Sequence, residues 1–194
     1  YSTTAMSAAE KFTAPSIYHI FGTDNFGRDI FSRVMQGLGT TLVISTSVVL
    51  FSTVAGVLLG AFTGYFGGIL DEILMRITDA VNGFPSILLT LVIISLLGKG
   101  RQNVIIALGI VFIPSFVRIV RGEFLRLRDA DYIKRARLMG VGRLRILFIH
   151  ILPNIFSVLL VSVMIGFNNA ILAESGMSYL GILSLIHISE PTRP

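Results

Sequence analysis

The chain has 194 residues, of which 53% are hydrophobic and only 14% are charged, with a formal net charge of +5 and a mean hydropathy of +0.80. Soluble domains carry about 25% charged residues, and a soluble fold of this size leaves much of its surface wet, so the composition excludes an ordinary soluble protein and indicates a protein surrounded by lipid. The absence of cysteine also excludes disulfide frameworks and thiolate metal sites.

Residues 1–39 are predicted to form an extracytoplasmic segment. The segment does not start with Met and lacks the basic region and apolar run of a signal peptide, so we expect the sequence to be truncated there. Asp24 with Arg28 and Asp29 with Arg33 form i,i+4 pairs, and apolar residues lie between them. The pattern predicts a short amphipathic helix on the outer membrane surface that leads into the first span.

The next part of the chain contains apolar stretches that are long enough to cross a bilayer, which takes about 20 residues. Helices satisfy their own backbone hydrogen bonds, as lipid demands, and the sequence lacks the period-two alternation of barrel strands. The sequence therefore predicts an all-α, polytopic transmembrane helix bundle. We expect this domain at residues 40–183, with spans at about 40–66, 72–97, 103–120 and 147–173.

Basic residues concentrate in one loop between these spans. Nine of the sixteen Lys and Arg residues lie from Arg118 to Arg145, whereas the turn at residues 98–103 carries two. The positive-inside rule then places the loop at residues 121–146 in the cytoplasm. The turn at residues 65–71 is predicted to lie on the same side, and the start of the chain outside, which implies a further spanning helix upstream.

A short helix is predicted within this cytoplasmic loop. Asp131 is a favourable N-cap for a helix that starts at Tyr132, and Gly140 suits the C′ position, where φ is positive, with Val141 as its apolar contact. The result is a basic helix of about two turns that lies outside the membrane. Spacing and charge alone favour docking to a protein partner and binding to anionic lipid equally.

Several residues in or near the spans are candidates for a solute pathway or a gate, and each also has an ordinary structural interpretation. An interfacial ion pair or a hydrogen bond between helices would explain the polar ones, and a kink common in packed bundles would explain the proline. The candidates are Arg76, Asp79, Pro85, Asn168 and Glu174. We favour an Arg76–Asp79 ion pair at headgroup level over a gate, because the two residues share a helix face.

Three glycines in the first span, Gly56, Gly60 and Gly64, have the small-xxx-small spacing that is typical of close contact between helices. The sequence contains no catalytic motif of the forms G-x4-G-K-[ST], G-x-S-x-G or H-E-x-x-H. His150 is interpreted as an interfacial residue, not a metal ligand, because no second ligand lies near it in sequence. We therefore expect no catalytic residues, no metal site and no ATP site in this chain.

The loop and its surroundings resemble a known family. Residues 132–154 resemble the signature loop of ABC importer permeases, E-A-A-x3-G-x9-I-x-L-P, with Ala136, Gly140, Leu152 and Pro153 in register. Other segments are similar to the oligopeptide, dipeptide and nickel branch of that family, in the same order. They are His19–Arg33, Gly64–Gly68, Asp71–Arg76, Phe84–Pro85, Val120–Glu123, His150–Asn154 and Ile171–Gly176.

The resemblance implies a permease of the type I ABC importer kind, a multi-pass protein of the bacterial inner membrane with about four of the family's six spanning helices present. Its expected role is to form half of a translocation pathway for peptides, or for nickel or related small solutes, and to couple to ATPase subunits. The implied coupling residues are Asp131, Tyr132, Lys134, Arg135, Ala136, Gly140, Gly142, Leu152 and Pro153. Lys134 and Arg135 depart from the family, whose signature has Glu and Ala there.

The implied partners are a homologous second permease subunit, two cytoplasmic ABC ATPase subunits that bind the ATP, an extracytoplasmic solute-binding protein and membrane lipid, but no nucleic acid. The alternative interpretation is a secondary transporter or channel subunit that ATP does not drive. A membrane scaffold without transport and a membrane enzyme are the other rivals. Residues 184–194 match nothing in the family, and we interpret them as an unrelated tail, an artefact of sequencing or assembly.

Overall fold

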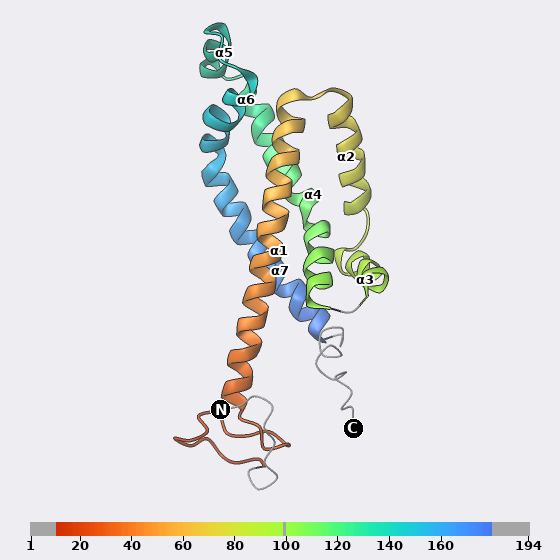
Figure 1. The fold of residues 1–194 in the computed structure, drawn as a ribbon, viewed down its shortest axis with the longest axis vertical. Coiled ribbons are helices and arrows are strands. Elements are labelled where there is room, and N and C mark those ends of the chain that lie inside the picture. Colours follow the sequence, from red (N-terminus) through yellow and green to blue (C-terminus); the bar gives the residue numbers. More distant parts are fainter. Residues whose placement is uncertain (1–10, 99, 180–194) are drawn as a thin grey trace. The chain divides into compact units, whose positions relative to one another are not determined.

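The computed structural model describes residues 11–98 and 100–179, and the predicted tail at 184–194 lies outside them. The chain divides into two compact units, Tyr1–Ile44 and Ser45–Pro194. The described residues form helices and no strand (Figure 1), which confirms the all-α fold. The helices are α1 (Ile30–Phe66), α2 (Gly68–Asn82), α3 (Ser86–Leu97), α4 (Arg101–Arg128), α5 (Asp131–Leu138), α6 (Arg143–Arg145), the π-helical turn η2 (Ile146–Ile151), the 3-10 turn η3 (Leu152–Ile155) and α7 (Phe156–Tyr179).

Three helical segments among the described residues are long and apolar enough to cross a membrane, and a bent pair would make a fourth span. The three are Ile30–Phe66, Arg101–Arg128 and Arg143–Tyr179, and the pair is α2 with α3. The structure thus agrees with the number of spans expected from the sequence when the bent pair counts as one.

The structure replaces the single helix expected at residues 72–97 with two helices whose axes differ by 97°. Pro85 precedes α3 with an extended backbone, φ −55° and ψ 124°. Proline has no N–H to continue the α2 hydrogen bonds and disfavours the helical conformation of the residue before it. The sequence predicted a bend at Pro85, and the structure shows a complete break of the helix there.

The other spans extend beyond their predicted ends. α4 continues to Arg128, so residues 121–128 of the expected loop are helical. The last helical segment runs from Arg143 to Tyr179, whereas the sequence predicted residues 147–173. Its first turns are irregular around Pro153, since a proline cannot donate the hydrogen bond of a regular α-helix.

A seam of glycines joins α1 to α4. A Cβ atom on Gly60 would lie 2.8 Å from the Val117 carbonyl oxygen, and one on Gly64 would lie 2.7 Å from the Arg121 carbonyl oxygen. Gly56 meets α4 in the same way one turn earlier. Any side chain at these positions would push the helices apart. The structure confirms the close contact that the spacing predicted.

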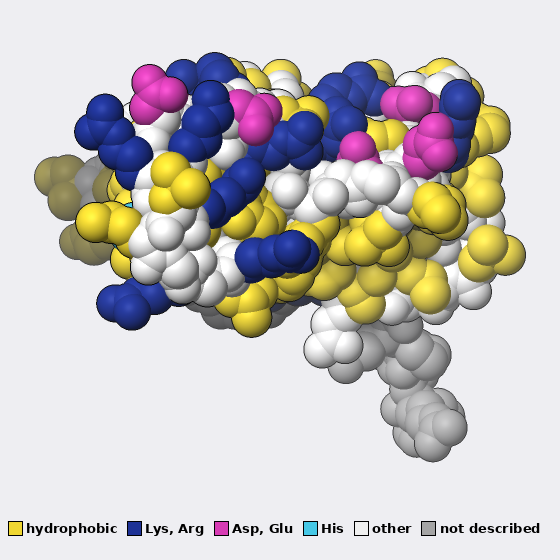
Figure 2. Space-filling view, turned by 90° about the horizontal axis from the view of Figure 1, so that it is seen from above, with side chains coloured by type: hydrophobic (Ala, Val, Ile, Leu, Met, Phe, Trp, Pro, Cys, Tyr) yellow, Lys and Arg dark blue, Asp and Glu magenta, His cyan; other side chains and the backbone are white. Residues whose placement is uncertain are grey.

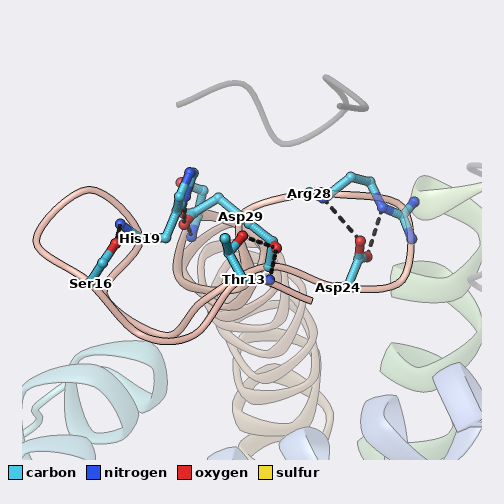
Figure 3. Close-up of polar contacts among 8 residues, drawn as sticks. Thr13, Ser16, His19, Asp24, Arg28 and Asp29 are labelled. Carbon is cyan, nitrogen blue, oxygen red and sulfur yellow. Dashed lines mark hydrogen bonds and ion pairs between the residues drawn. The ribbon is translucent and has the colours of Figure 1, made fainter. Parts of the chain in front are cut away.

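The unit Tyr1–Ile44, described from residue 11, contains two aspartates that organise its turns (Figure 3). Asp24 accepts hydrogen bonds from the backbone N–H groups of Phe26 and Arg28 at 2.8 and 3.0 Å, and from the Arg28 guanidinium at 2.8 Å. Desolvation raises the pKa of Asp24, but these hydrogen bonds outweigh it and hold that pKa well below its usual range. The charged carboxylate therefore fixes the turn at residues 24–28.

The second aspartate, Asp29, holds the start of α1. It accepts hydrogen bonds from the Ser32 hydroxyl and backbone N–H at 2.6 and 2.8 Å and lies 3.0 Å from His19 Nδ1. The hydrogen bonds from Ser32 and His19 lower the pKa of Asp29 to about 2. The sequence had predicted an Asp29–Arg33 pair, but the guanidinium of Arg33 contacts Asp24.

The separate amphipathic helix expected within residues 1–39 is replaced, in the part that the structure describes, by turns that lead into α1 at Ile30. The predicted Asp24–Arg28 pair exists, but it spans a turn. The helix does not form here because aspartate side chains that accept hydrogen bonds from nearby backbone N–H groups favour turns and caps over helix.

The glycine seam predicts that Gly60→Ala destabilises the protein by about 1–3 kcal/mol, because the added methyl group collides with α4. Gly122→Ala, on α4, is the matched control, since a Cβ there has no atom within 4 Å. The control should be neutral or slightly stabilising. The measurement is reversible unfolding of both variants in mixed micelles, and equal stability of the two would contradict the seam.

Candidate functional site

The basic loop lies at one end of the unit Ser45–Pro194. Figure 1 shows α5 and α6 at the end where α1 passes into α2, with the connection from α3 to α4 at the opposite end. Seen from above in Figure 2, Lys and Arg side chains gather over this face, with acidic side chains among them. The arrangement agrees with the prediction that the turn at residues 65–71 and the basic loop share one side of the membrane.

The start of α5 differs by one residue from the sequence prediction. Ala130 is the N-cap, with an extended backbone, and Asp131 is the first residue of the helix without a capping hydrogen bond. A carboxylate in the first turn still stabilises the helix through its dipole. Lys134, one turn later, lies 3.8 Å from the Asp131 carboxylate in an exposed pair.

The end of α5 is a Schellman motif, as the sequence predicted. Gly140 has a positive φ of 79°. Its N–H donates to the Arg137 carbonyl at 3.0 Å, and the Val141 N–H donates to the Ala136 carbonyl at 3.1 Å. Gly140 therefore stops the helix and turns the chain toward α6.

The short helix is anchored through Ile133, a residue that the sequence analysis did not single out. Its side chain is fully buried in an apolar cluster with Phe124 of α4. The other buried members are Ala61, Tyr65, Val120, Ile146, Leu147, Ile151 and Ile155. The only signal in the sequence was an aliphatic residue within an otherwise polar stretch, between Tyr132 and Lys134. Through this cluster, α5 is attached to α1, α4 and the start of the last helical segment.

The predicted coupling residues divide between the core and the surface. Ala136 and Leu152 pack partly buried against the apolar cluster. The exposed ones are Asp131, Tyr132, Lys134, Arg135, Gly140, Gly142 and Pro153. Two further residues that the prediction lacked, Leu138 and Met139, are 89% and 84% exposed at the tip of α5. The surface of α5 thus presents an apolar tip beside basic side chains.

Two ion pairs hold α2 against α4. The Arg121 guanidinium binds both carboxylate oxygens of Asp71, at 2.5 and 2.7 Å. Arg118 donates to Asp79 at 2.9 Å. The expected Arg76–Asp79 pair is not among the ion pairs of the described residues, and Arg76 is exposed on α2. Asp79 thus pairs with Arg118 on the facing helix α4 and not with Arg76 on its own helix.

The other pathway candidates differ in their exposure and surroundings. Pro85 separates α2 from α3, Asn168 is exposed on α7, and Glu174 is buried on the same helix, with 5% of its surface exposed. The nearby cleft among α3, α4 and α7 has a volume of about 10 Å³ and is lined by residues that include Thr90 and Met177. This volume suits about one water molecule, so the cleft is too small for a solute.

Comparison with known proteins identifies relatives of most of the chain. The family model described as "Binding-protein-dependent transport system inner membrane component" matches residues 56–189. The match extends into the segment 184–194 that the sequence analysis had set apart. A putative peptide transport system permease protein of Brucella suis is 44% identical over 178 residues, which are 92% of this chain and 60% of that relative.

Two further relatives are permease proteins with named transport systems. The dipeptide transport system permease protein of Alkalihalophilus pseudofirmus is 39% identical, over 90% of this chain and 57% of its own length. The oligopeptide transport system permease protein of Bacillus subtilis is 38% identical, over 94% of this chain and 59% of its own length. The chain thus spans about 60% of the length of the curated relatives it matches.

The ion pair between Asp71 of α2 and Arg121 of α4 leads to a prediction about the free energy of unfolding. In a double-mutant cycle, Asp71→Asn and Arg121→Gln should couple by about 1–3 kcal/mol, because a two-pronged, partly buried ion pair is lost. The matched cycle of Glu123→Gln with Arg126→Gln tests an exposed pair on α4. It should couple by less than about 0.5 kcal/mol. Equal coupling energies in the two cycles would show that the Asp71–Arg121 ion pair does not hold α2 against α4.

Proposed function

The chain belongs to the family of binding-protein-dependent transport system inner membrane components, multi-pass proteins of the bacterial inner membrane, and from this premise we propose that it is a transmembrane subunit of an ATP-driven ABC importer of peptides. It forms half of the translocation pathway and couples it to cytoplasmic ATPase subunits. The observation that carries the coupling role is α5, a short helix with an exposed tip and a buried anchor.

Peptides are the proposed solute class because the relatives that match most of the chain are named for peptide, dipeptide and oligopeptide transport. The sequence lacks the catalytic motifs G-x4-G-K-[ST], G-x-S-x-G and H-E-x-x-H, and uptake without modification is the proposed activity. The described residues contain no group of three or more His, Cys, Asp or Glu side chains that could hold a metal. In this proposal, ATP is bound by the partner subunits, and the chain has no enzymatic activity of its own.

A second permease subunit is the proposed neighbour of α7. Met164 and Leu172 are 67% and 64% exposed, and Asn168, also exposed, lies between them with the i, i+4 spacing of one helix face. A polar amide in the middle of a membrane-spanning helix favours a protein neighbour or a wet pathway over lipid. A homologous subunit that covers this stripe would place Asn168 at the shared pathway.

The proposed partners on the two sides of the membrane are two ATPase subunits inside and a solute-binding protein outside. The ATPase subunits would bind the exposed face of α5. Because Lys134 and Arg135 replace the Glu and Ala of the family's signature, the ATPase subunit would need carboxylates opposite them to replace the contact made by the signature Glu. The buried face of α5 would pass their movement to the apolar cluster. The switch between inward and outward access is then a rigid-body motion, biased by the different ATP affinity of the two states.

The proposal predicts that Gly140→Trp blocks ATP-driven peptide uptake by the assembled importer in proteoliposomes, while membrane insertion stays normal. The bulky residue must adopt the left-handed φ of 79° at the end of α5, which only glycine and a few residues such as Asn visit readily.

Gly140→Asn is the matched control, because Asn tolerates this conformation, and it should retain most of the uptake. Normal uptake by the Gly140→Trp importer would contradict the docking role of α5. Uptake by the chain without any ATPase subunit would instead favour the alternative, a transporter or channel that ATP does not drive.

A further inference from the structure

The charges at the basic end of the unit Ser45–Pro194 are not balanced. Five acidic residues of this region each pair with one basic residue. The pairs are Asp71–Arg121, Asp79–Arg118, Glu123–Arg126, Asp129–Arg128 and Asp131–Lys134. On α2, Glu72 and Arg76 have no ion pair within the described part of the chain, and their opposite charges cancel. Four arginines of α5 and α6 are also without an ion pair there: Arg135, Arg137, Arg143 and Arg145. Unpaired arginines in this number indicate a surface that attracts anions.

Two of these four arginines line one hollow. Arg137 of α5 and Arg143 of α6 lie around a space of about 460 Å³ together with Tyr65, Phe66 and Val141. The volume is within the usual range of ligand sites, about 300–1,000 Å³. The end of α1 and the stretch 137–143, which are far apart in the sequence, therefore meet at a basic, partly aromatic cavity that is open to the surface.

The floor of the hollow is a buried aromatic ring. Tyr65 is 7% exposed and belongs to the apolar cluster that anchors α5. The guanidinium carbon of Arg137 lies 5.3 Å from the centre of the Tyr65 ring. A cation held over the face of an aromatic ring keeps its orientation, and its N–H groups remain available at the ring's edge for an anion. The hollow thus presents a preformed cationic group.

The position of the hollow determines which anion can reach it. Phe66 is the last residue of α1, so the hollow lies where a membrane-spanning helix emerges from the lipid. One helical turn earlier on α1, Phe62 stacks on Phe66 with ring centres 5.8 Å apart. Both rings are partly exposed, at 36% and 44%. The site is therefore basic at the membrane surface and apolar on the side that continues into the membrane.

We propose that this hollow binds one anionic phospholipid of the cytoplasmic leaflet. Arg137 and Arg143 bind the phosphate oxygens with charge-assisted hydrogen bonds, and Phe62 with Phe66 contacts the apolar part of the same molecule. Basic pockets on the cytoplasmic side of membrane helices suit such headgroups. An acidic protein partner would use the arginines but not the apolar continuation along α1, which is why lipid is the better fit. This role goes beyond the proposed transport function and does not depend on it.

The test uses the full chain in nanodiscs of phosphatidylethanolamine with a minor fraction of phosphatidylglycerol. Phosphatidylglycerol retained after gentle detergent extraction is counted by native mass spectrometry. Arg137→Gln with Arg143→Gln should reduce its retention at least about tenfold, since two charge-assisted contacts are lost. Arg135→Gln with Arg145→Gln removes the same charge outside the hollow and should leave retention unchanged. Excess inorganic phosphate should not displace the lipid.

Three results would overturn the proposal. The first is equal loss of lipid in the two double variants, which would show a diffuse charge effect. The second is displacement by inorganic phosphate, which would identify a site for the free ion. The third is unchanged lipid retention with loss of ATPase-subunit capture, which would assign the hollow to a protein partner. If the Arg137 variant does not fold, Arg143→Gln against Arg145→Gln gives the same comparison at two exposed residues.

Discussion

The close approach of α1 to α4 is the contact on which the rest of the unit Ser45–Pro194 depends. Lipid provides no hydrophobic force between helices, so packing and hydrogen bonds must hold them together. The glycine seam meets this constraint, and the Ser52 hydroxyl adds a hydrogen bond of 2.9 Å to the Gly109 carbonyl. Because the two backbones are this close, Tyr65 of α1 and Phe124 of α4 enter one apolar cluster. Ile133 packs into that cluster, so the geometry of α5 follows from the seam between the two spans.

The basic end of the unit Ser45–Pro194 contains charged side chains of two kinds, those in ion pairs and those without a partner acid among the described residues. Carboxylates of α2 pair with arginines of α4 and hold the broken α2–α3 segment against the seam. At the same end, α5 and α6 carry arginines that form no ion pair within the described part of the chain. The ion pairs hold α2 on α4, whereas the unpaired arginines leave positive charge available at the surface. Both rely on the long, planar guanidinium group, which binds carboxylate, phosphate and aromatic rings with defined geometry.

The sequence predicted what depends on local chemistry or on regular spacing. The seam at Gly60, the positive φ of Gly140 and the four apolar segments are of this kind, since each follows from backbone sterics or from the length of a bilayer. It could not predict what depends on neighbours in space. Asp79 pairs across to another helix, and Ile133 is buried by residues from three other segments. The 97° break at Pro85 lies between these cases, because a proline predicts a bend but packing determines its size.

In the proposed importer, we expect α5 and the α1–α4 seam to move as one rigid body when the transporter changes between its inward and outward states. Spin labels at Arg135 on α5 and at Leu58 on α1, both exposed, would measure it by pulsed electron resonance in the assembled importer, with and without ATP. We expect the same distance distribution in both states, because the buried cluster links the two helices. A distance that changes with ATP would show instead that α5 moves independently of the seam.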